Sequence, residues 1–267
     1  MRFLLPIIIA FAGLLGNACA NEKGLPATIT YAHWNIGHFA MGKSCNPTIP
    51  ASESAMRAKE YEHFIKDLKA DVFGCSEFDS VFDQAGGKTV DKLFSSYDTA
   101  NIGPKNTYQS NAIFTKGLKR VQCEIVNYTN RCQSTYFIDA TYLMDGQEVH
   151  FVQTHLDWNS NAKATRSRPM QIQQLIGYFA SKEHVVIAGD FNVYAAAEYL
   201  PFQQAGYQLA SCGANGPVQT VEGDSNSFRA IDNLLAKGFS IQKVRTADDE
   251  YKLSDHKLLL CTLRLLP

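Results

Sequence analysis

The 267-residue sequence lacks the features that mark several classes of protein. Charged residues make up only 19% of the chain, and 25 Lys and Arg nearly balance 26 Asp and Glu. This low charge, combined with an ordinary apolar content, excludes a disordered tail and a coiled coil. Because there is no basic excess, no strong positive field marks the chain as a nucleic-acid binder. From residue 21 onward, no hydrophobic run approaches the length of a membrane span.

The sequence also has no internal repeat and no low-complexity linker. It contains neither a Cys-x-x-Cys pair nor a His-Glu-x-x-His motif, and their absence argues against a zinc site. Strand-like and helix-like segments alternate along the chain instead. The expected strands are 28–34, 71–76, 111–114, 120–126, 135–143, 149–154, 185–188, 231–236, 239–244 and 257–265, and the expected helices are 53–69 and 163–180. We therefore expect one α/β domain over residues 21–267, with sheets packed face to face and helices outside.

Residues 1–20 have the pattern of a secretory signal peptide. Arg2 precedes the apolar stretch 3–15, and Ala18-Cys19-Ala20 has the small-x-small pattern of a signal-peptidase site. The pattern predicts a secreted or periplasmic protein. The alternative is a lipoprotein anchored through Cys19.

Export would bring the six remaining cysteines into an oxidising compartment, where disulfides can form. Cys123 and Cys132 flank a polar turn between two expected strands, so they are the predicted hairpin disulfide. Whether Cys45 and Cys212 also pair is left open by the sequence.

Polar side chains stand where several expected strands end. They are Asn35, Glu77, His155, Asp190, Asn192, Asp232, Asp255 and His256. Residues just past strand ends line the ligand crevice of α/β sheets, although any one of them could equally cap or make a turn. Together they suit phosphate-ester hydrolysis, because oxygen ligands favour Mg²⁺ and histidines move protons near neutral pH. His33 and His38 have no such companions and are expected to be ordinary loop or face residues.

These stretches resemble the endonuclease/exonuclease/phosphatase superfamily, typified by pancreatic deoxyribonuclease. The matching segments follow the family's order: His33-Trp34-Asn35-Ile36, Ser76-Glu77, Ser110-Asn111-Ala112-Ile113, Thr154-His155-Leu156-Asp157, Gly189-Asp190-Phe191-Asn192, Ala230-Ile231-Asp232-Asn233 and Ser254-Asp255-His256. The resemblance implies an α/β fold built as a four-layer αββα sandwich, in which two packed mixed β-sheets are flanked by helices. It places the site at one end of the sheets.

The resemblance also implies the metal ligands. Glu77 looks like the main metal carboxylate, supported by Asn35, and Asp255 looks like a further ligand. Mg²⁺ is the expected cation, with Mn²⁺ and Ca²⁺ as alternatives. One departure is Ser76, which stands where the family usually has a glutamine before the metal glutamate.

The implied catalytic residues are five. Asp190 and Asn192 resemble the pair that orients the attacking water and contacts the phosphate. His256 resembles the general base or phosphate-stabilising donor, with Asp232 fixing its tautomer. His155 resembles the histidine that donates a hydrogen bond or proton as the ester oxygen leaves.

The expected reaction is in-line attack of water on a phosphodiester, and a secreted, monomeric nuclease is the first choice. The predicted substrate contacts are Asn111, Asp157, Arg166, Arg168, Tyr108 and Trp158. One alternative is a sphingomyelinase-like phospholipase, which would need an exposed apolar hairpin to enter a membrane. Phe78 and Phe82 are the only candidates for it, and such residues more often belong to the core. Another is a phosphoinositide or sugar-phosphate phosphatase. A binding module without activity is disfavoured, because every metal and proton-transfer position is present.

Overall fold

The structure, a computed structural model, describes residues 28–39, 51–78, 93–104, 110–131, 135–158, 162–214, 216–221, 228–247 and 253–267. Within 51–57 and 163–165 only the backbone is described. The predicted signal peptide and the residues Cys45, Phe82, Tyr108 and Cys132 lie outside the described residues. The predictions made for the signal peptide, Phe82 and Tyr108 stay predictions.

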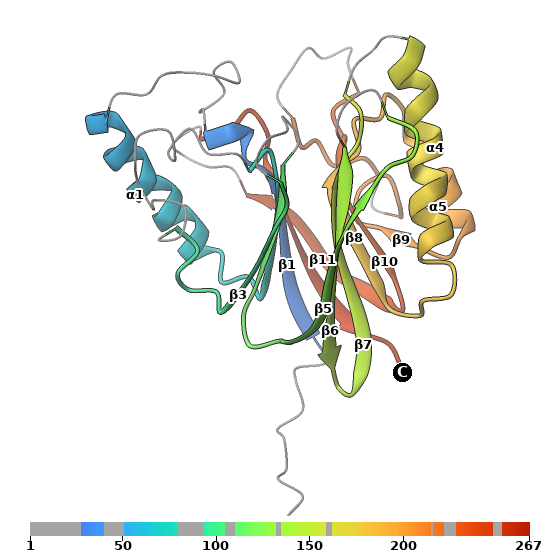
Figure 1. The fold of residues 1–267 in the computed structure, drawn as a ribbon, viewed down its shortest axis with the longest axis horizontal. Coiled ribbons are helices and arrows are strands. Elements are labelled where there is room, and N and C mark those ends of the chain that lie inside the picture. The colour runs from blue at the N-terminus through green and yellow to red at the C-terminus, as the bar shows by residue number, and fades with distance from the viewer. Residues whose placement is uncertain are drawn as a thin grey trace, which may run out of the picture.

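Two six-stranded sheets form the body of the molecule (Figure 1). Sheet A has the order β11-β12-β1-β2-β4-β3, and sheet B has the order β5-β6-β7-β8-β10-β9. The strands are β1 Thr28–Asn35, β2 Val72–Ser76, β3 Thr99–Ile102, β4 Asn111–Thr115, β5 Lys119–Asn127, β6 Tyr136–Met144, β7 Gln147–His155, β8 Val185–Asp190, β9 Gln208–Leu209, β10 Asp232–Lys237, β11 Phe239–Ala247 and β12 Leu258–Leu265. Both sheets are mixed, because β1 pairs with β2, and β7 with β8, in parallel while the other pairs are antiparallel.

Helices cover the outer faces of both sheets (Figure 1). Helix α1, Ala51–Asp67, packs Tyr61 and Ile65 against sheet A. Helix α4, Ala162–Tyr178, packs Ile172 and Leu175 against sheet B, next to the short helix α5, Leu200–Gln204. The order helix, sheet, sheet, helix confirms the predicted four-layer αββα sandwich.

Alternation along the strands decides which side chains face the gap between the sheets. In β1, Ile29 and Tyr31 belong to the cluster between the sheets, whereas Ala32 and Trp34 belong to the cluster under α1. His33 and Asn35 continue the inward-facing set. Polar residues at the ends of the central strands therefore point into the space between the two sheets.

Five elements were not predicted from the sequence. They are β3, β9, α5 and the 3-10 helices η1, Gly37–Phe39, and η2, Ala196–Tyr199. Each has five residues or fewer, which is too short for hydrophobic periodicity to develop. The edge strands β3 and β9 owe their form to pairing with β4 and β10.

The predicted disulfide between Cys123 and Cys132 is wrong, because Cys123 has a free thiol in the structure. The hairpin register pairs Cys123 with Ala140, and the strand continues for four more residues to Asn127. Those residues extend the strand by about 13 Å, so Cys123 lies far from the end of β5 at which the connection to β6 begins. Cys212 also has a free thiol. None of the helices in the described ranges is both long and apolar enough to span a membrane.

Candidate active site

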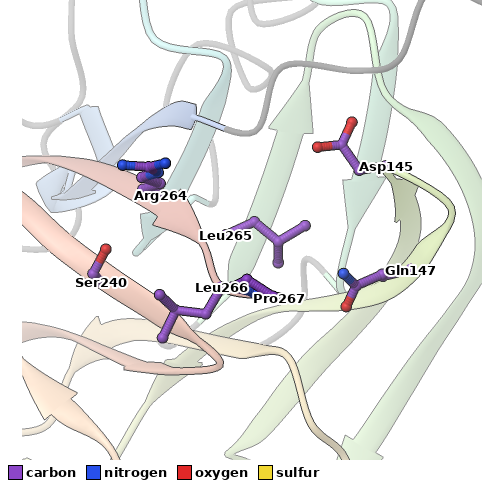
Figure 2. A pocket seen from close by; sticks show the side chains of 7 residues that line it. All are labelled: Asp145, Gln147, Ser240, Arg264, Leu265, Leu266 and Pro267. Carbon is purple, nitrogen blue, oxygen red and sulfur yellow. The ribbon is translucent and has the colours of Figure 1, made fainter.

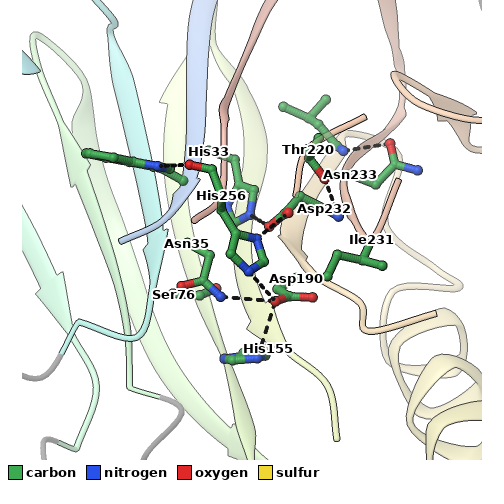
Figure 3. Close-up of polar contacts among 12 residues, drawn as sticks. His33, Asn35, Ser76, His155, Asp190, Thr220, Ile231, Asp232, Asn233 and His256 are labelled. Atoms are coloured by element: carbon green, nitrogen blue, oxygen red, sulfur yellow. Dashed lines mark hydrogen bonds and ion pairs between the residues drawn. The ribbon is translucent and has the colours of Figure 1, made fainter. Parts of the chain in front are cut away.

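Polar side chains from both sheets meet at the edge where β1, β2, β7 and β8 end. Strand register aligns Asn35, Ser76 and Asn111 in sheet A, and His155, Asp190 and Asp232 in sheet B. Figure 3 shows His256 next to Asn35, Asp190 and Asp232, with Ser76 and His155 close by. His256 belongs to the segment before β12. The site is thus assembled from strand ends that are far apart in the sequence.

Asp232 and His256 form a buried ion pair, with His256 Nδ1 2.7 Å from Asp232 Oδ2. Burial alone would lower the pKa of His256, but the Asp232 carboxylate outweighs burial and raises it to about 10. Burial would conversely raise the pKa of Asp232, yet His256 and His33 hold it well below its usual range. At neutral pH this pair is an imidazolium bound to a carboxylate.

Asp190 stands at the end of β8 in sheet B and contacts Asn35 of sheet A. Its Oδ2 accepts a hydrogen bond from Asn35 Nδ2 at 3.0 Å and lies 3.6 Å from His155 Nε2 and 3.9 Å from His256 Nε2. Its Oδ1 accepts a hydrogen bond from the backbone N–H of Asn192 at 2.9 Å. Burial, and then the charge of Asp232, raise the pKa of Asp190 to about 7. This carboxylate can therefore take up a proton near neutral pH.

Glu77 follows β2 directly and has a left-handed backbone, with φ of 55°. Its Oε1 accepts a hydrogen bond from Asn35 Nδ2 at 3.2 Å, and its Oε2 lies 3.0 Å from His38 Nε2. Burial would raise the pKa of Glu77, but the hydrogen bond from His38 and the charges of His155, His38 and His256 together outweigh burial and lower the pKa to about 2. Strained backbone of this kind clusters at functional positions. Glu77 is ionised, and 23% of its side chain stays exposed.

His155 is buried at the end of β7. Burial lowers its pKa to about 4, even though the nearby Glu77 charge acts in the opposite direction. Its Nδ1 has no hydrogen-bond partner among the described residues. His155 is therefore a neutral imidazole at pH 7, unlike His256.

The donor set fits a hard divalent cation. Ligand atoms of Asp190, Asp232 and His256 lie within 4.8 Å of one another, and ionised Glu77 is joined to the same network through Asn35. A divalent cation relieves this concentration of carboxylate charge, and Mg²⁺ prefers carboxylate oxygen. The predicted ligands Glu77 and Asn35 lie beside this group and are hydrogen-bonded to each other. Asn35 Oδ1 accepts a hydrogen bond from Gly37 N–H at 3.1 Å, and the third predicted ligand, Asp255, is exposed.

The opposite end of the sandwich has no comparable group of acids in the described residues. A hollow of about 360 Å³ lies there, between the β6–β7 hairpin and the C-terminus (Figure 2). It is lined by Asp145, Gln147, Ser240, Arg264, Leu265, Leu266 and Pro267. The polar residues that suit phosphate-ester chemistry thus gather at one end of the sheets.

The sequence profile described as the Endonuclease/Exonuclease/phosphatase family matches residues 32–256. The chain belongs to this family. It is accordingly a metal-dependent phosphoesterase of the endonuclease/exonuclease/phosphatase type, which agrees with the converging acids of the site.

Solved structures share the endonuclease/exonuclease/phosphatase fold at low identity. The structure of D. rerio TDP2 complexed with single strand DNA product is 16% identical, with a TM-score of 0.69 over 89% of this chain and 99% of that chain. The human Nocturnin catalytic domain with bound sulfate is 16% identical, with a TM-score of 0.68 over 91% and 96%. A family member from Bacteroides vulgatus is 17% identical, with a TM-score of 0.66 over 89% and 99%. No curated protein matches the chain.

The family-predicted catalytic residues lie together, and the predicted substrate contacts fall into two groups. Arg166 is exposed, and Trp158 is 55% exposed in the segment after β7. Asn111 is buried, with its Nδ2 donating a hydrogen bond to the Tyr136 carbonyl at 3.3 Å. Asp157 is also buried and accepts a hydrogen bond from Ser167 Oγ.

Arg168 is buried and engaged by its own chain. It donates to the Asp157 carbonyl at 3.2 Å, its guanidinium lies 4.6 Å from the centre of the Tyr194 ring, and its Nε is 3.7 Å from Glu198 Oε2. These contacts hold the segment after β7 against the segment after β8. The position of Arg168 thus supports a positioning function more than the predicted contact with substrate.

Sequence reasoning missed three residues of the network. The expectation that His33 and His38 are ordinary loop or face residues is wrong, because His33 contacts Asp232 at 3.0 Å and His38 contacts Glu77. Gln153 was not singled out, and it donates hydrogen bonds to His33 and Ser76. The available signal was the spacing of two residues between His33 and Asn35, which places both on one face of β1.

Proposed function

We propose that this phosphoesterase is a secreted, Mg²⁺-dependent nuclease that hydrolyses phosphodiester bonds by in-line attack of water. The observation that carries the proposal is Asp190, a buried acid with a pKa near 7 that contacts Asn35 and lies next to His155 and His256. A general base works best when its pKa is close to the working pH.

Asp190 accepts the proton of the attacking water as the new oxygen–phosphorus bond forms. The Asn192 N–H and the Asn35 amide hold its two oxygens, so that the carboxylate has a fixed orientation. The bond from phosphorus to the leaving oxygen breaks on the opposite side of the phosphate, the leaving oxygen takes a proton from solvent water, and Asp190 returns its proton to solvent.

The two histidines have different functions in this scheme. His256 is an imidazolium held by Asp232, and its Nε2–H donates to a phosphate oxygen. His155 is neutral, so it stabilises the phosphate or leaving oxygen as a hydrogen-bond donor without releasing a proton. A bound Mg²⁺, held by Glu77 beside the Asp190–Asp232–His256 group, would offset negative charge on the phosphate and the leaving oxygen.

Exposed aromatic residues in the segments that follow His155 and Asp190, and an exposed arginine in α4, support nucleic acid as the substrate. Trp158 and Tyr194 are 55% and 50% exposed, and Tyr194 Oη donates to the Trp158 carbonyl at 3.4 Å. Aromatic rings stack on bases, and exposed arginines such as Arg166 contact backbone phosphates. The phospholipase alternative loses Phe78, which is buried in the core beneath α1 and is not available to enter a membrane.

The test is conversion of supercoiled plasmid to open-circular DNA by the purified protein, with Mg²⁺, Mn²⁺ or Ca²⁺ and with chelator. We expect nicking that requires a divalent cation and disappears in His256→Ala. His150→Ala is the matched control, because it removes a buried, Asp-paired histidine away from the site. Intact plasmid with every cation, together with hydrolysis of sphingomyelin or an inositol phosphate, would contradict the nuclease assignment.

Secretion is proposed from the sequence pattern of residues 1–20. N-terminal sequencing of the protein recovered from medium or periplasm should begin at Asn21. A chain that begins at an acylated Cys19 would support the lipoprotein alternative.

A further inference from the structure

We propose that His33 is a positioning residue, which fixes the Asp232 carboxylate and through it the orientation of His256. The inference rests on the proposed phosphoesterase mechanism and adds a residue to it. His33 is fully buried and faces the gap between the sheets, so substrate does not reach it.

Asp232 is held by a histidine on each of its two oxygens. His33 Nε2 lies 3.0 Å from Oδ1, and His256 Nδ1 lies 2.7 Å from Oδ2 (Figure 3). A carboxylate held at one oxygen can rotate about its Cβ–Cγ bond. Contacts on both oxygens remove that freedom, so the plane of the carboxylate, and with it the direction of the His256 ring, is defined.

Gln153 determines which nitrogen of His33 carries the proton. Ser76 Oγ donates to the Thr154 carbonyl at 3.3 Å, so its lone pair accepts a hydrogen bond from Gln153 Nε2 at 3.1 Å. The second hydrogen on the same nitrogen points to His33 Nδ1, also at 3.1 Å. His33 Nδ1 is then the acceptor, and its Nε2–H donates to Asp232. Each donor in this buried chain meets an acceptor.

Gly74 makes room for the Gln153 side chain. A Cβ atom at this position would lie 2.2 Å from Gln153 Oε1 and 2.8 Å from Tyr31 Oη. Gly74→Ala should therefore push the Gln153 amide away from His33 without changing a residue that contacts the substrate. Gly74→Ala therefore disturbs the contact between Gln153 and His33 while His33 itself is retained.

The main test compares kcat and KM for bis(4-nitrophenyl) phosphate and for DNA, with Mg²⁺, in wild type, His33→Leu and His33→Gln. Glutamine can place its Nε2–H where the His33 Nε2–H lies, and leucine cannot donate. We expect His33→Leu to lower kcat by roughly 10- to 100-fold with KM unchanged, the usual cost of losing an indirect partner of a site, while His33→Gln keeps most of the rate. Equal kcat in wild type and His33→Leu would overturn the inference.

A double-mutant cycle separates positioning from general loss of structure. If His33 acts through Asp232, His33→Leu should lower kcat no further in an Asp232→Asn background. The full 10- to 100-fold loss in that background would show that His33 acts elsewhere. Should His33→Leu fail to fold, Gly74→Ala takes its place in the cycle. Its control is Gly177→Ala, where the added Cβ meets no atom of the described residues within 4 Å.

A readout without substrate keeps this inference separate from the proposed function. The Nδ1–H proton of His256 should give a slowly exchanging, downfield NMR signal in wild type and His33→Gln, and the signal should be lost in His33→Leu. If wild type hydrolyses no phosphoester but shows this pattern, the proposed function fails and the positioning of His256 by His33 stands. If the signal persists in His33→Leu, the positioning inference fails whatever the activity.

Discussion

Two aspartates of sheet B each form a buried pair with a histidine, and comparing the pairs shows what makes one of them part of a site. Asp232–His256 is joined through Nδ1 at 2.7 Å, and Asp139–His150 is joined through Nδ1 at 2.9 Å. Neither pair has more than a tenth of any side chain exposed. Burial and pairing distance therefore do not distinguish them.

The difference lies in what surrounds each pair. Asp139–His150 faces α4, where His150 Nδ1 also lies 3.2 Å from Thr141 Oγ1 and the His150 ring packs edge-on to Phe179 at 5.7 Å. Asp232–His256 faces the gap between the sheets, with Asp190 3.9 Å from the free ring nitrogen of His256. An Asp–His pair becomes chemically useful when a third acid stands at its open end.

The two Asp–His pairs should differ most in their response to divalent cations. Chelation of divalent cations is expected to abolish phosphoesterase activity, because the carboxylates of the site need a cation to bind phosphate. Addition of Mg²⁺ should shift the NMR signals of His256 and leave those of His150 in place. Equal shifts at both histidines would show that the cation does not bind where the acids converge.

The second largest difference should be the effect on kcat of replacing each histidine by alanine. His256→Ala is expected to lower kcat by roughly 10²- to 10⁴-fold, the range for a positioned acid or base. His150→Ala should keep the wild-type kcat, since its pair does not face the site. Steady-state kinetics on DNA with folded, metal-loaded proteins measures both, and retention of most activity in His256→Ala would reject the assignment.

Protonation should differ among the histidines of the metal-free protein. The pKa of His256 is raised from 6.5 to about 10, and that of His155 is lowered from 6.5 to about 4. Ring-proton NMR titration should thus find His256 charged and His155 neutral at pH 7. A midpoint near 6.5 for both would contradict the ion pair and the burial that shift them.

The raised pKa of His256 also determines how the stability of the folded protein changes with pH. A raised pKa in the folded protein means that the pair's contribution is full below pH 6.5 and is lost as pH rises through about 10. The depressed pKa of Asp232 means that its contribution is lost only in strong acid. The gap in unfolding free energy between wild type and His256→Ala should therefore be wide at pH 6 and narrow at pH 10, as measured by urea titration.

Disruption of the Asp139–His150 pair should have the smallest effect on activity. It should nevertheless lower the stability of the protein clearly. His150→Ala leaves the Asp139 carboxylate buried without its imidazole, and should lower the free energy of unfolding by about 3 kcal/mol. Urea denaturation of wild type and variant gives this number. Unchanged stability would mean that Thr141 and solvent are sufficient for Asp139.

Much of the fold and the main acids could be predicted before the structure. Alternating apolar residues located the central strands and the two long helices to within a few residues. Asn35, Glu77 and Asp190 were found because each stands at the end of such a strand, where local order stops and side chains are free to serve a ligand.

Contacts between the sheets could not be predicted in the same way. His33 and Asp232 are 199 residues apart, and their contact exists because β1 and β10 face each other across the sandwich. The surroundings of Cys123 were misjudged for the same reason, since the register of β5 against β6 decided them. Periodicity along one strand tells which residues share a face. Which other face covers them depends on how the two sheets pack, and so the tertiary structure alone decided that His33 joins His256 as a partner of Asp232.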